Sequence, residues 1–414
     1  MNRRDFLKSA LSLAILAPTA RFAAQADETT PATTKSDPAA KVVRRRYKNT
    51  DLTVPLIGFG TMRLPVNGAK RAINYAEGEK LIARAMEAGI NYFDTAWFYH
   101  EGESENFLGT ALSKYPRESY CLADKMPVSR CKSAADAEEI FQKQLTKTKA
   151  GYFDFYLVHA LNKKGWEKTL KFKIIDFLLN MQKSGKIRKL GFSFHDSPDL
   201  LRKIAHYHAW DFALIQLNYI DWTAYRSKEQ YEILTERGIP IMIMEPLKGG
   251  SLANPPPATR KILENAAPDA SPASWAFRYC GTLPNVLCIL SGMTKMEHLQ
   301  ENIKIFTDFK PLSEFEQKTL QTAITAGKNA DLIPCTACRY CMPCPADVEI
   351  PAIFSLWNKL KTDKNESAFL KDYKALPEDS RASACVNCQK CVKQCPQKIA
   401  IPDLMKKIAK QYPG

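Results

Sequence analysis

The sequence of 414 residues predicts an α/β protein whose larger part is a (β/α)8 TIM barrel, followed by a small α-helical domain. Short β-rich runs alternate with amphipathic helical runs over residues 47–310, and about 250 residues is the usual size of such a barrel. A doubly wound sheet is the alternative fold. It would favour a glycine-rich phosphate turn after an early strand, and residues 58–62 (Gly-Phe-Gly-Thr-Met) do not form a G-x-G-x-x-G motif. The pattern therefore favours the barrel.

The N-terminal segment has the features of an export signal. The pair Arg3-Arg4 precedes an apolar run over residues 10–17, and residues 24–26 (Ala-Gln-Ala) offer an A-x-A cleavage site. The run is too short to span a bilayer, and the arginine pair resembles a twin-arginine signal. The alternative is a basic start followed by a chance apolar run. We expect a signal peptide over residues 1–26, an exported and hence periplasmic protein, and a flexible Pro/Thr-rich linker over residues 27–46.

Eight strands are expected in the barrel, each bounded by turn or helix signals. Their ranges are 55–60, 91–95, 120–123, 155–159, 190–194, 213–217, 239–244 and 286–290. The clearest helices between them have apolar residues at helical spacing over 79–88, 134–149, 174–184 and 198–206.

Polar or titratable residues stand at nearly every predicted C-terminal strand end. Chemistry in a (β/α)8 barrel is carried out at this end of the strands, where the loops form the site. Each such residue has an ordinary explanation alone, as a helix cap or a solvated charge, but together around one rim they indicate an active site. The rim residues are Asp94, Tyr99, Asp124, Lys125, His159, Ser193, His195, Gln216, Asn218, Glu245, Pro246, Ser291 and Gly292.

Four of these residues carry a resemblance to a known family. Residues 91–99 (Asn-Tyr-Phe-Asp-Thr-Ala-Trp-Phe-Tyr) resemble the D-T-A-x-x-Y signature of the aldo-keto reductases, while Lys125 and His159 resemble their strand-three lysine and strand-four histidine. The resemblance covers residues 47–310. More narrowly, the chain resembles the exported subfamily in which this barrel precedes a ferredoxin-like tail. The resemblance implies an oxidoreductase acting on CH–OH or C=O groups, with Asp94, Tyr99, Lys125 and His159 as catalytic residues.

The chemistry of this family explains the four residues. When a hydride moves between a nicotinamide and a carbonyl carbon, a proton must move to or from the carbonyl oxygen. We expect Tyr99 to be this general acid and base, with a pKa lowered from about 10. Lys125 would favour the tyrosinate, Asp94 would hold the lysine charged and in place, and His159 would orient the substrate oxygen.

The resemblance also implies a nicotinamide cofactor, either NADP(H) or NAD(H). Ser193 and Gln216 stand where the family binds the carboxamide, although Phe194 and His195 replace the usual asparagine after the serine. The loop after strand eight has no clear cation for a 2′-phosphate, so the choice between NADP and NAD stays open. The remaining expected contacts, to the pyrophosphate and the adenosine end, are Glu245, Pro246, Leu247, Gly249, Ser291, Gly292, Met293, Glu301 and Asn302.

Residues 311–330 predict a helix that connects the two domains. Ser313 and Glu316 form a capping-box pattern at its start. Such a helix would hold the tail against the barrel more firmly than a loose linker. An apolar stretch at residues 350–360 has two interpretations, since it could pack the tail on the barrel or form a helix internal to the tail.

Eight of the twelve cysteines lie in two runs within residues 331–414. The first run has the spacing C-x2-C-x2-C-x2-C-P, and the second has C-x2-C-x2-C-x3-C-P, which matches bacterial ferredoxins. Zinc would need only two C-x2-C pairs, and a disulfide scaffold would not need such tight repeats. The tail is therefore predicted to be a ferredoxin-like domain with two [4Fe–4S] clusters. We expect the two ligand sets to be Cys335, Cys338, Cys341 and Cys395, and Cys385, Cys388, Cys391 and Cys344.

The expected partners are a small carbonyl or alcohol substrate, a redox partner protein and the twin-arginine export machinery. The formal net charge of +15 does not indicate nucleic-acid binding, because the lysines are scattered without an interleaved aromatic stripe. No stable transmembrane span is expected. Because the cell envelope has no ordinary pool of NAD(P)H, a nicotinamide would have to be exported tightly bound and recycled in place through the clusters. No flavin site is recognisable in the sequence.

Two other functions stay open. The chain could be an electron-transfer or binding protein whose barrel is a catalytically silent scaffold, or the clusters could act only as structural staples. The complete set of Asp94, Tyr99, Lys125 and His159 favours the enzyme, since a scaffold has no need to keep all four.

Overall fold

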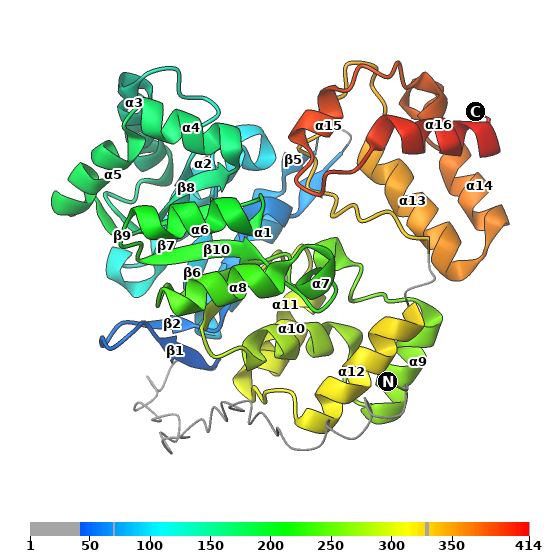
Figure 1. Ribbon diagram of the computed structural model, residues 1–414, viewed down its shortest axis with the longest axis horizontal. Coiled ribbons are helices and arrows are strands. Elements are labelled where there is room, and N and C mark those ends of the chain that lie inside the picture. The colour runs from blue at the N-terminus through cyan, green and yellow to red at the C-terminus, as the bar shows by residue number, and fades with distance from the viewer. Residues whose placement is uncertain (1–41, 69–70, 328–330, 414) are drawn as a thin grey trace, which may run out of the picture. The chain divides into compact units, whose positions relative to one another are not determined.

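Eight parallel strands form a closed barrel in the computed structural model, which describes residues 42–68, 71–327 and 331–413 (Figure 1). The order around the barrel is β10-β11-β12-β3-β6-β7-β8-β9, so β12 closes on β3. The predicted fold and all eight predicted strands are confirmed. The strands are β3 (Ile57–Gly60), β6 (Tyr92–Asp94), β7 (Cys121–Met126), β8 (Phe153–Leu161), β9 (Ile187–Phe194), β10 (Phe212–Gln216), β11 (Ile241–Met244) and β12 (Val286–Ser291).

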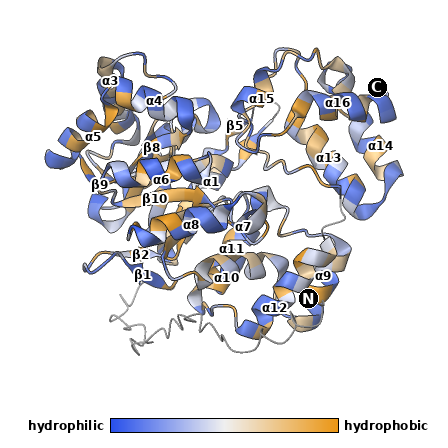
Figure 2. Cartoon of the chain, in the orientation of Figure 1, coloured by the Kyte–Doolittle hydropathy of each residue, from blue (hydrophilic) through white to orange (hydrophobic). Residues whose placement is uncertain are grey.

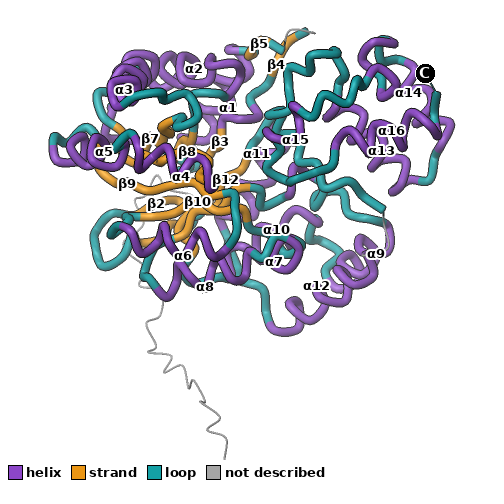
Figure 3. Tube along the Cα trace, turned by 45° about the horizontal axis from the view of Figure 1, so that its top comes forward, coloured by secondary structure: helices purple, strands orange, loops and turns teal. Residues whose placement is uncertain are grey.

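Helices follow the strands and form an outer layer, so that the strands gather inside a ring of helices (Figure 3). The strands are mostly hydrophobic, whereas the helices mix polar and hydrophobic residues (Figure 2), as expected for strands buried on both faces. The helices of this part are α1 (Tyr75–Glu87), α2 (Glu103–Ala111), α3 (Ala134–Thr148), α4 (Lys163–Lys171), α5 (Ile174–Lys183), α6 (Pro198–Tyr207), α7 (Asp221–Ala224), α8 (Ser227–Glu236), α9 (Pro257–Ala266), α10 (Pro272–Thr282), α11 (Met296–Thr307) and α12 (Glu314–Gly327).

A short hairpin before the barrel corrects the predicted linker. Residues 27–46 are expected to be flexible, but Arg44–Arg46 form strand β1, which pairs antiparallel with β2 (Thr53–Pro55). The arginines look like linker residues because they are charged. In the structure they instead donate to backbone carbonyls, Arg45 to Leu283 O at 3.0 Å and also to Gly281 and Val286. The predicted signal peptide at 1–26 and the first part of the linker lie outside the described residues.

The helix α12 contains the predicted capping box. Ser313 N donates to Glu316 Oε2 at 2.8 Å, and Glu316 N donates back to Ser313 Oγ at 3.3 Å. Leu320 and Ala323 pack in one buried cluster with Leu263 of α9. The helix therefore belongs to the outer layer of the barrel rather than to a free connection.

The tail has a hydrophobic core of its own. It contains α13 (Ile350–Asp363), α14 (Glu366–Lys374), α15 (Lys390–Gln394) and α16 (Ile401–Gln411). Phe354 and Trp357 of α13 are buried among other tail residues, including Met405. Of the two interpretations of residues 350–360, the helix internal to the tail is therefore the one observed. No helix in the described ranges is long and apolar enough to cross a membrane.

Candidate active site

The four predicted catalytic residues meet at the C-terminal end of the barrel. Asp94 ends β6, Lys125 lies in β7, His159 lies in β8, and Tyr99 starts the short helix η2 (Tyr99–Gly102) after β6. The Lys125 ammonium donates to Asp94 Oδ1 and to the carbonyl of Thr95, both at 2.6 Å, and lies 3.5 Å from the Tyr99 hydroxyl. The lysine is only 1% exposed, so Lys125 and Asp94 form a buried ion pair beside the Tyr99 hydroxyl.

The electrostatics of Tyr99 differ from the expectation that Lys125 would lower its pKa. Burial raises the pKa of Tyr99 well above its ordinary value, and the acidic groups Asp94, Glu245 and Asp124 raise it further. Burial is the largest cause, and the positive charge of Lys125 is already paired with Asp94. Burial raises the pKa of Asp94 as well, while Lys125 lowers it. In this state the phenol is protonated at neutral pH.

His159 is held by an irregularity of its strand. The register of β8 against β9 shifts between Val158 and Leu161, and Ala160 has a φ of 51°. The Ala160 N–H that this frees donates to Ser193 Oγ at 2.7 Å. A bulge of this kind re-aims a side chain at the rim of a barrel. The structure thus gives Ser193, predicted as a carboxamide contact, a local role in supporting the backbone beside His159.

A second histidine lies beside the first. Burial lowers the pKa of His159 well below its ordinary value, with further lowering by Lys125 and His195, and burial lowers the pKa of His195 to about 4. Both rings are therefore neutral at pH 7. The Nδ1 atoms of both are buried without a hydrogen-bond partner among the described residues. The ring of His159 also contacts Tyr99, with centroids 6.4 Å apart.

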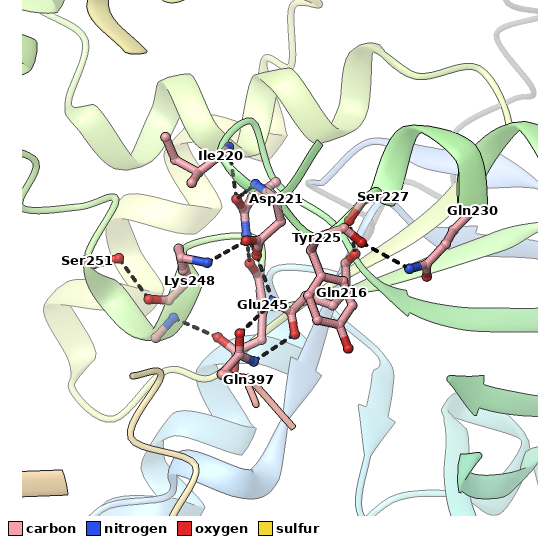
Figure 4. A network of polar contacts seen from close by, with 12 residues as sticks. Gln216, Ile220, Asp221, Tyr225, Ser227, Gln230, Glu245, Lys248, Ser251 and Gln397 are labelled. Carbon is pink, nitrogen blue, oxygen red and sulfur yellow. Dashed lines mark hydrogen bonds and ion pairs between the residues drawn. The ribbon is translucent and has the colours of Figure 1, made fainter. Parts of the chain in front are cut away.

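Gln216 lies at the end of β10 and is 0% exposed. Its Nε2 donates to Asp221 Oδ2 at 2.7 Å and to Gln397 Oε1 at 3.1 Å, while its Oε1 accepts from Gln397 Nε2 at 2.8 Å (Figure 4). Asp221 also pairs with Lys248. Gln397 belongs to the tail, so a tail side chain occupies the amide that was predicted to bind the nicotinamide.

The loop after β11 is also in contact with the tail. Glu245 Oε2 accepts from Gly249 N at 2.6 Å, and Gly249 has a φ of +68°. A Cβ added at Gly249 would lie 2.5 Å from Thr336 Cα and 2.6 Å from its carbonyl oxygen. Arg63 donates to that same carbonyl and lies 3.7 Å from Glu245 Oε1. The predicted pyrophosphate loop, Glu245, Pro246, Leu247 and Gly249, therefore packs against Thr336.

The predicted adenosine end is arranged differently. Asn302 Nδ2 donates to Ser291 Oγ at 3.1 Å, and both residues are buried together with Met293. Gly292 and Glu301 are exposed. Among the described residues, those predicted to bind the adenosine end make no contact with the tail comparable to the contacts of Gln216 and Gly249.

The cysteines of the tail line two hollows. One, of about 320 Å³, is lined by Cys335, Cys338, Cys341 and Cys395. The other, of about 370 Å³, is partly open to solvent. Its lining includes Cys344, Cys385, Cys388 and Cys391, and also Cys341. The first hollow joins three cysteines of the first run to the last cysteine of the second. The second hollow joins three cysteines of the second run to both Cys341 and Cys344 of the first, so the crossed ligand sets stay a prediction. Among the described residues, no group of three or more His, Cys, Asp or Glu side chains is placed to hold a metal ion.

The first hollow borders the barrel at two predicted cofactor residues. Thr336 and Gln397 line the hollow. Thr336 lies against Gly249 and accepts from Arg63, and Gln397 pairs with Gln216. This part of the tail therefore lies at the C-terminal ends of the barrel strands.

A nicotinamide does not fit this arrangement. The carboxamide contact Gln216 has both its donor and its acceptor engaged inside the protein, and the backbone of Thr336 fills the space over Gly249. The residues responsible, Thr336 and Gln397, were not expected from the sequence. They stand one residue after Cys335 and two after Cys395, and nothing in a cysteine run signals a contact with a distant barrel.

Comparisons with known proteins agree with this geometry. Residues 56–324 match the model of the aldo/keto reductase family, and residues 334–400 match that of a 4Fe-4S dicluster domain. The chain is 25% identical over 310 residues to an uncharacterized oxidoreductase, YqkF, of Bacillus subtilis, covering 67% of this chain and 95% of the relative. It is 24% identical over 312 residues to an NADH-specific methylglyoxal reductase of Escherichia coli, covering 61% and 90%.

A solved structure supports the fold. The holo form of the aldo-keto reductase AKR11C1 from Bacillus halodurans aligns with a TM-score of 0.57 at 22% identity, over 68% of this chain and 96% of the other. The matched relatives are thus covered almost completely by the barrel, and the dicluster tail lies beyond the family match.

Proposed function

The chain belongs to the aldo/keto reductase family, and on that premise we propose that it interconverts a carbonyl and an alcohol at Tyr99, coupled to electron transfer through two [4Fe–4S] clusters. The observation that carries the proposal is the position of the first cysteine hollow, which is lined by Thr336 and Gln397, the tail residues that contact Gly249 and Gln216 at the barrel rim.

Tyr99 is proposed to move the proton of the reaction. Because burial keeps its pKa high, the phenol is a proton donor for a substrate oxygen in the reducing direction. Lys125, 3.5 Å from the hydroxyl, is placed to stabilise the tyrosinate that remains, and Asp94 keeps the lysine in position. His159, whose lowered pKa keeps its ring neutral, is proposed to orient the substrate oxygen.

The electron balance calls for a redox partner. Oxidation of an alcohol to a carbonyl releases two electrons and two protons, and reduction takes up the same number. Tyr99 would carry the proton of the oxygen, and the proton of the carbon would exchange with solvent. The clusters, when bound, would take up or supply the two electrons singly, one on each cluster. We therefore propose a one-electron carrier protein as the external partner. The eight cysteines in their two hollows are the residues that would hold the clusters.

Hydride transfer from NADP(H) or NAD(H) was the expected route. Because the cell envelope has no ordinary pool of NAD(P)H, that nicotinamide was expected to be exported tightly bound to the protein. Because Gln216 and Gly249 are covered by the tail, we assign no step to a nicotinamide.

We propose that the protein is exported by the twin-arginine route to the periplasm. The motif at residues 1–26 supports this, as does the requirement that a cluster protein be assembled before it leaves the cytoplasm. N-terminal sequencing of the exported form should find cleavage after Ala26.

The relatives suggest the size of the substrate. Their names include a methylglyoxal reductase, an L-galactose dehydrogenase and a 6-dehydroglucose reductase, all of which point to small polar carbonyls or alcohols. We propose the same substrate class for this chain.

Replacing the phenol tests the function. Tyr99→Phe should lower turnover of a small carbonyl, with a chemical one-electron reductant, by about 10²-fold or more. Its iron and sulfide content should stay that of the natural protein. Tyr207→Phe is a matched control. Tyr207 ends α6, is 54% exposed and is not one of the four catalytic residues. Full activity in Tyr99→Phe would contradict the proposal and favour the electron-transfer or binding protein with a silent barrel.

A further inference from the structure

The tail of this protein covers the part of the barrel where the family's nicotinamide was expected. We propose that the docked tail takes the place of the nicotinamide, so that this chain binds no free NADH or NADPH. The inference builds on the proposed oxidoreductase function, and it specifies what fills the cofactor end of the site.

The first contact is the pair of side-chain amides. A carboxamide bound at Gln216 would have to take over the atoms that Gln397 now uses, since Gln216 accepts from Gln397 Nε2 at 2.8 Å and donates to its Oε1 at 3.1 Å. The remaining donor capacity of Gln216 is directed at Asp221 Oδ2 at 2.7 Å. Two amides paired in this way satisfy each other as a nicotinamide carboxamide would satisfy Gln216.

The second contact is the backbone of the first cysteine run. Thr336 is 2% exposed and lies so close to Gly249 that not even a methyl group would fit between them. Arg63 donates to the Thr336 carbonyl, and Glu245 accepts from the Gly249 N–H. A pyrophosphate at this loop would have to approach the backbone at Gly249, where Thr336 already lies.

The third feature is continuity between the two contacts. Thr336 and Gln397 both line the first cysteine hollow, together with Cys335, Cys338, Cys341 and Cys395. The two residues that meet the predicted nicotinamide positions therefore belong to one part of the tail, the part that surrounds the expected first cluster.

A tail that opened to admit the cofactor is the rival explanation. Opening would break the paired amides and the Arg63 hydrogen bond, which are partly buried. Any nicotinamide would then bind only to the small open fraction, which reduces its apparent affinity by that fraction. Two measurements therefore distinguish a tail that replaces the nicotinamide from a tail that opens to admit it. They are the affinity of the intact protein for nicotinamide and the hydrogen exchange of the tail amides.

The test is a titration of the cluster-loaded full-length protein with NADH and with NADPH, by calorimetry under anaerobic conditions. Hydrogen exchange of residues 334–341 and 395–399 is measured in parallel. We expect no saturable binding up to about 1 mM, the upper end of ordinary Michaelis constants, and unchanged exchange. Saturable one-to-one binding with a protected tail would overturn the proposal, and binding with faster tail exchange would replace it with an opening tail.

A variant shows whether the tail is the cause. The double substitution Arg63→Ala with Gln397→Ala removes both polar anchors and should raise nicotinamide affinity at least about tenfold, into the measurable range. Arg63→Ala with Gln394→Ala is the matched control, because Gln394 is an exposed glutamine of the same segment. No gain in the folded, cluster-loaded Gln397 variant over this control would contradict the tail as the block. If the variants do not fold, the titration of the natural protein still decides.

These readouts are independent of turnover. Loss of the proposed function would appear in the activity of Tyr99→Phe, whereas failure of this inference would appear as nicotinamide binding to a protein of any activity.

Discussion

Gly249 offers the sharpest test of tail docking, because its neighbour Gly250 provides a matched control. Both glycines have positive φ, +68° and +98°, so alanine at either position carries left-handed backbone strain of about 1–2 kcal/mol. Only at Gly249 does the new methyl meet the tail. A Cβ there would be 2.5 Å from Thr336 Cα, whereas a Cβ at Gly250 has nothing within 4 Å.

The magnitude follows from that distance. Carbon atoms in contact are normally about 3.5–4.0 Å apart, so the Thr336 segment must retreat by about 1 Å to admit the methyl group. Overpacking of this kind costs about 1–3 kcal/mol. Gly250→Ala carries no less backbone strain, since +98° lies further from the left-handed minimum near +57°. Gly249→Ala should therefore increase the undocked fraction about 5- to 150-fold relative to Gly250→Ala.

Hydrogen exchange on the cluster-loaded variants measures this difference directly. We expect residues 334–341 to exchange faster in Gly249→Ala than in Gly250→Ala, with the barrel strands equally protected in both. Equal exchange of this segment in the two variants would refute the close packing of Thr336 on Gly249 and, with it, the docked tail.

Three further predictions concern the catalytic and cluster residues. Lys125→Met should destabilise the barrel by about 3–5 kcal/mol at pH 7, because it leaves Asp94 buried without its cation. The loss in melting temperature should shrink toward pH 5. Without Lys125 the pKa of Asp94, already raised by burial, rises further, so the carboxyl becomes neutral. His159→Gln should flatten the fall in stability between pH 7 and 5, since unfolding protonates the natural histidine near pH 6.5 while its folded pKa lies well below that value; parallel melting curves across that range would show that the ring is not held neutral. Cys395→Ala should remove the same paramagnetic resonance signal as Cys338→Ala, and Cys344→Ala the same signal as Cys388→Ala; the opposite pairing would contradict the crossed ligand sets.

Much of the barrel was predictable because its signals are local. Runs such as those in β8 and β10 are short, continuous and apolar, as strands buried on both faces must be. The ends of β6, β7 and β8 place Asp94, Lys125 and His159 around one rim wherever the chain closes into a barrel. The dicluster tail was predictable for the same reason, since the cysteine spacing is a pattern within each run. The crossed ligand sets stay a prediction.

The docked tail was not predictable because its contacts are distant in sequence. Gln216 and Gln397 are 181 residues apart, and neither shows its partner in its own neighbourhood. The pKa of Tyr99 was misjudged for a related reason. Proximity to Lys125 could be inferred, but the burial that outweighs it depends on the packing of the whole rim. The arginines of β1 are likewise as typical of a linker as of a strand until the carbonyls that they contact are known.

The measurement that tests the central claim most directly is the redox state of the clusters during turnover without nicotinamide. Reduced, cluster-loaded protein is mixed anaerobically with a panel of small aldehydes and ketones, and oxidised protein with the corresponding alcohols, while paramagnetic resonance follows the clusters. We predict that at least one compound changes the cluster oxidation state in the natural protein and leaves it unchanged in Tyr99→Phe. Clusters that respond only after NADH or NADPH is added would contradict the account.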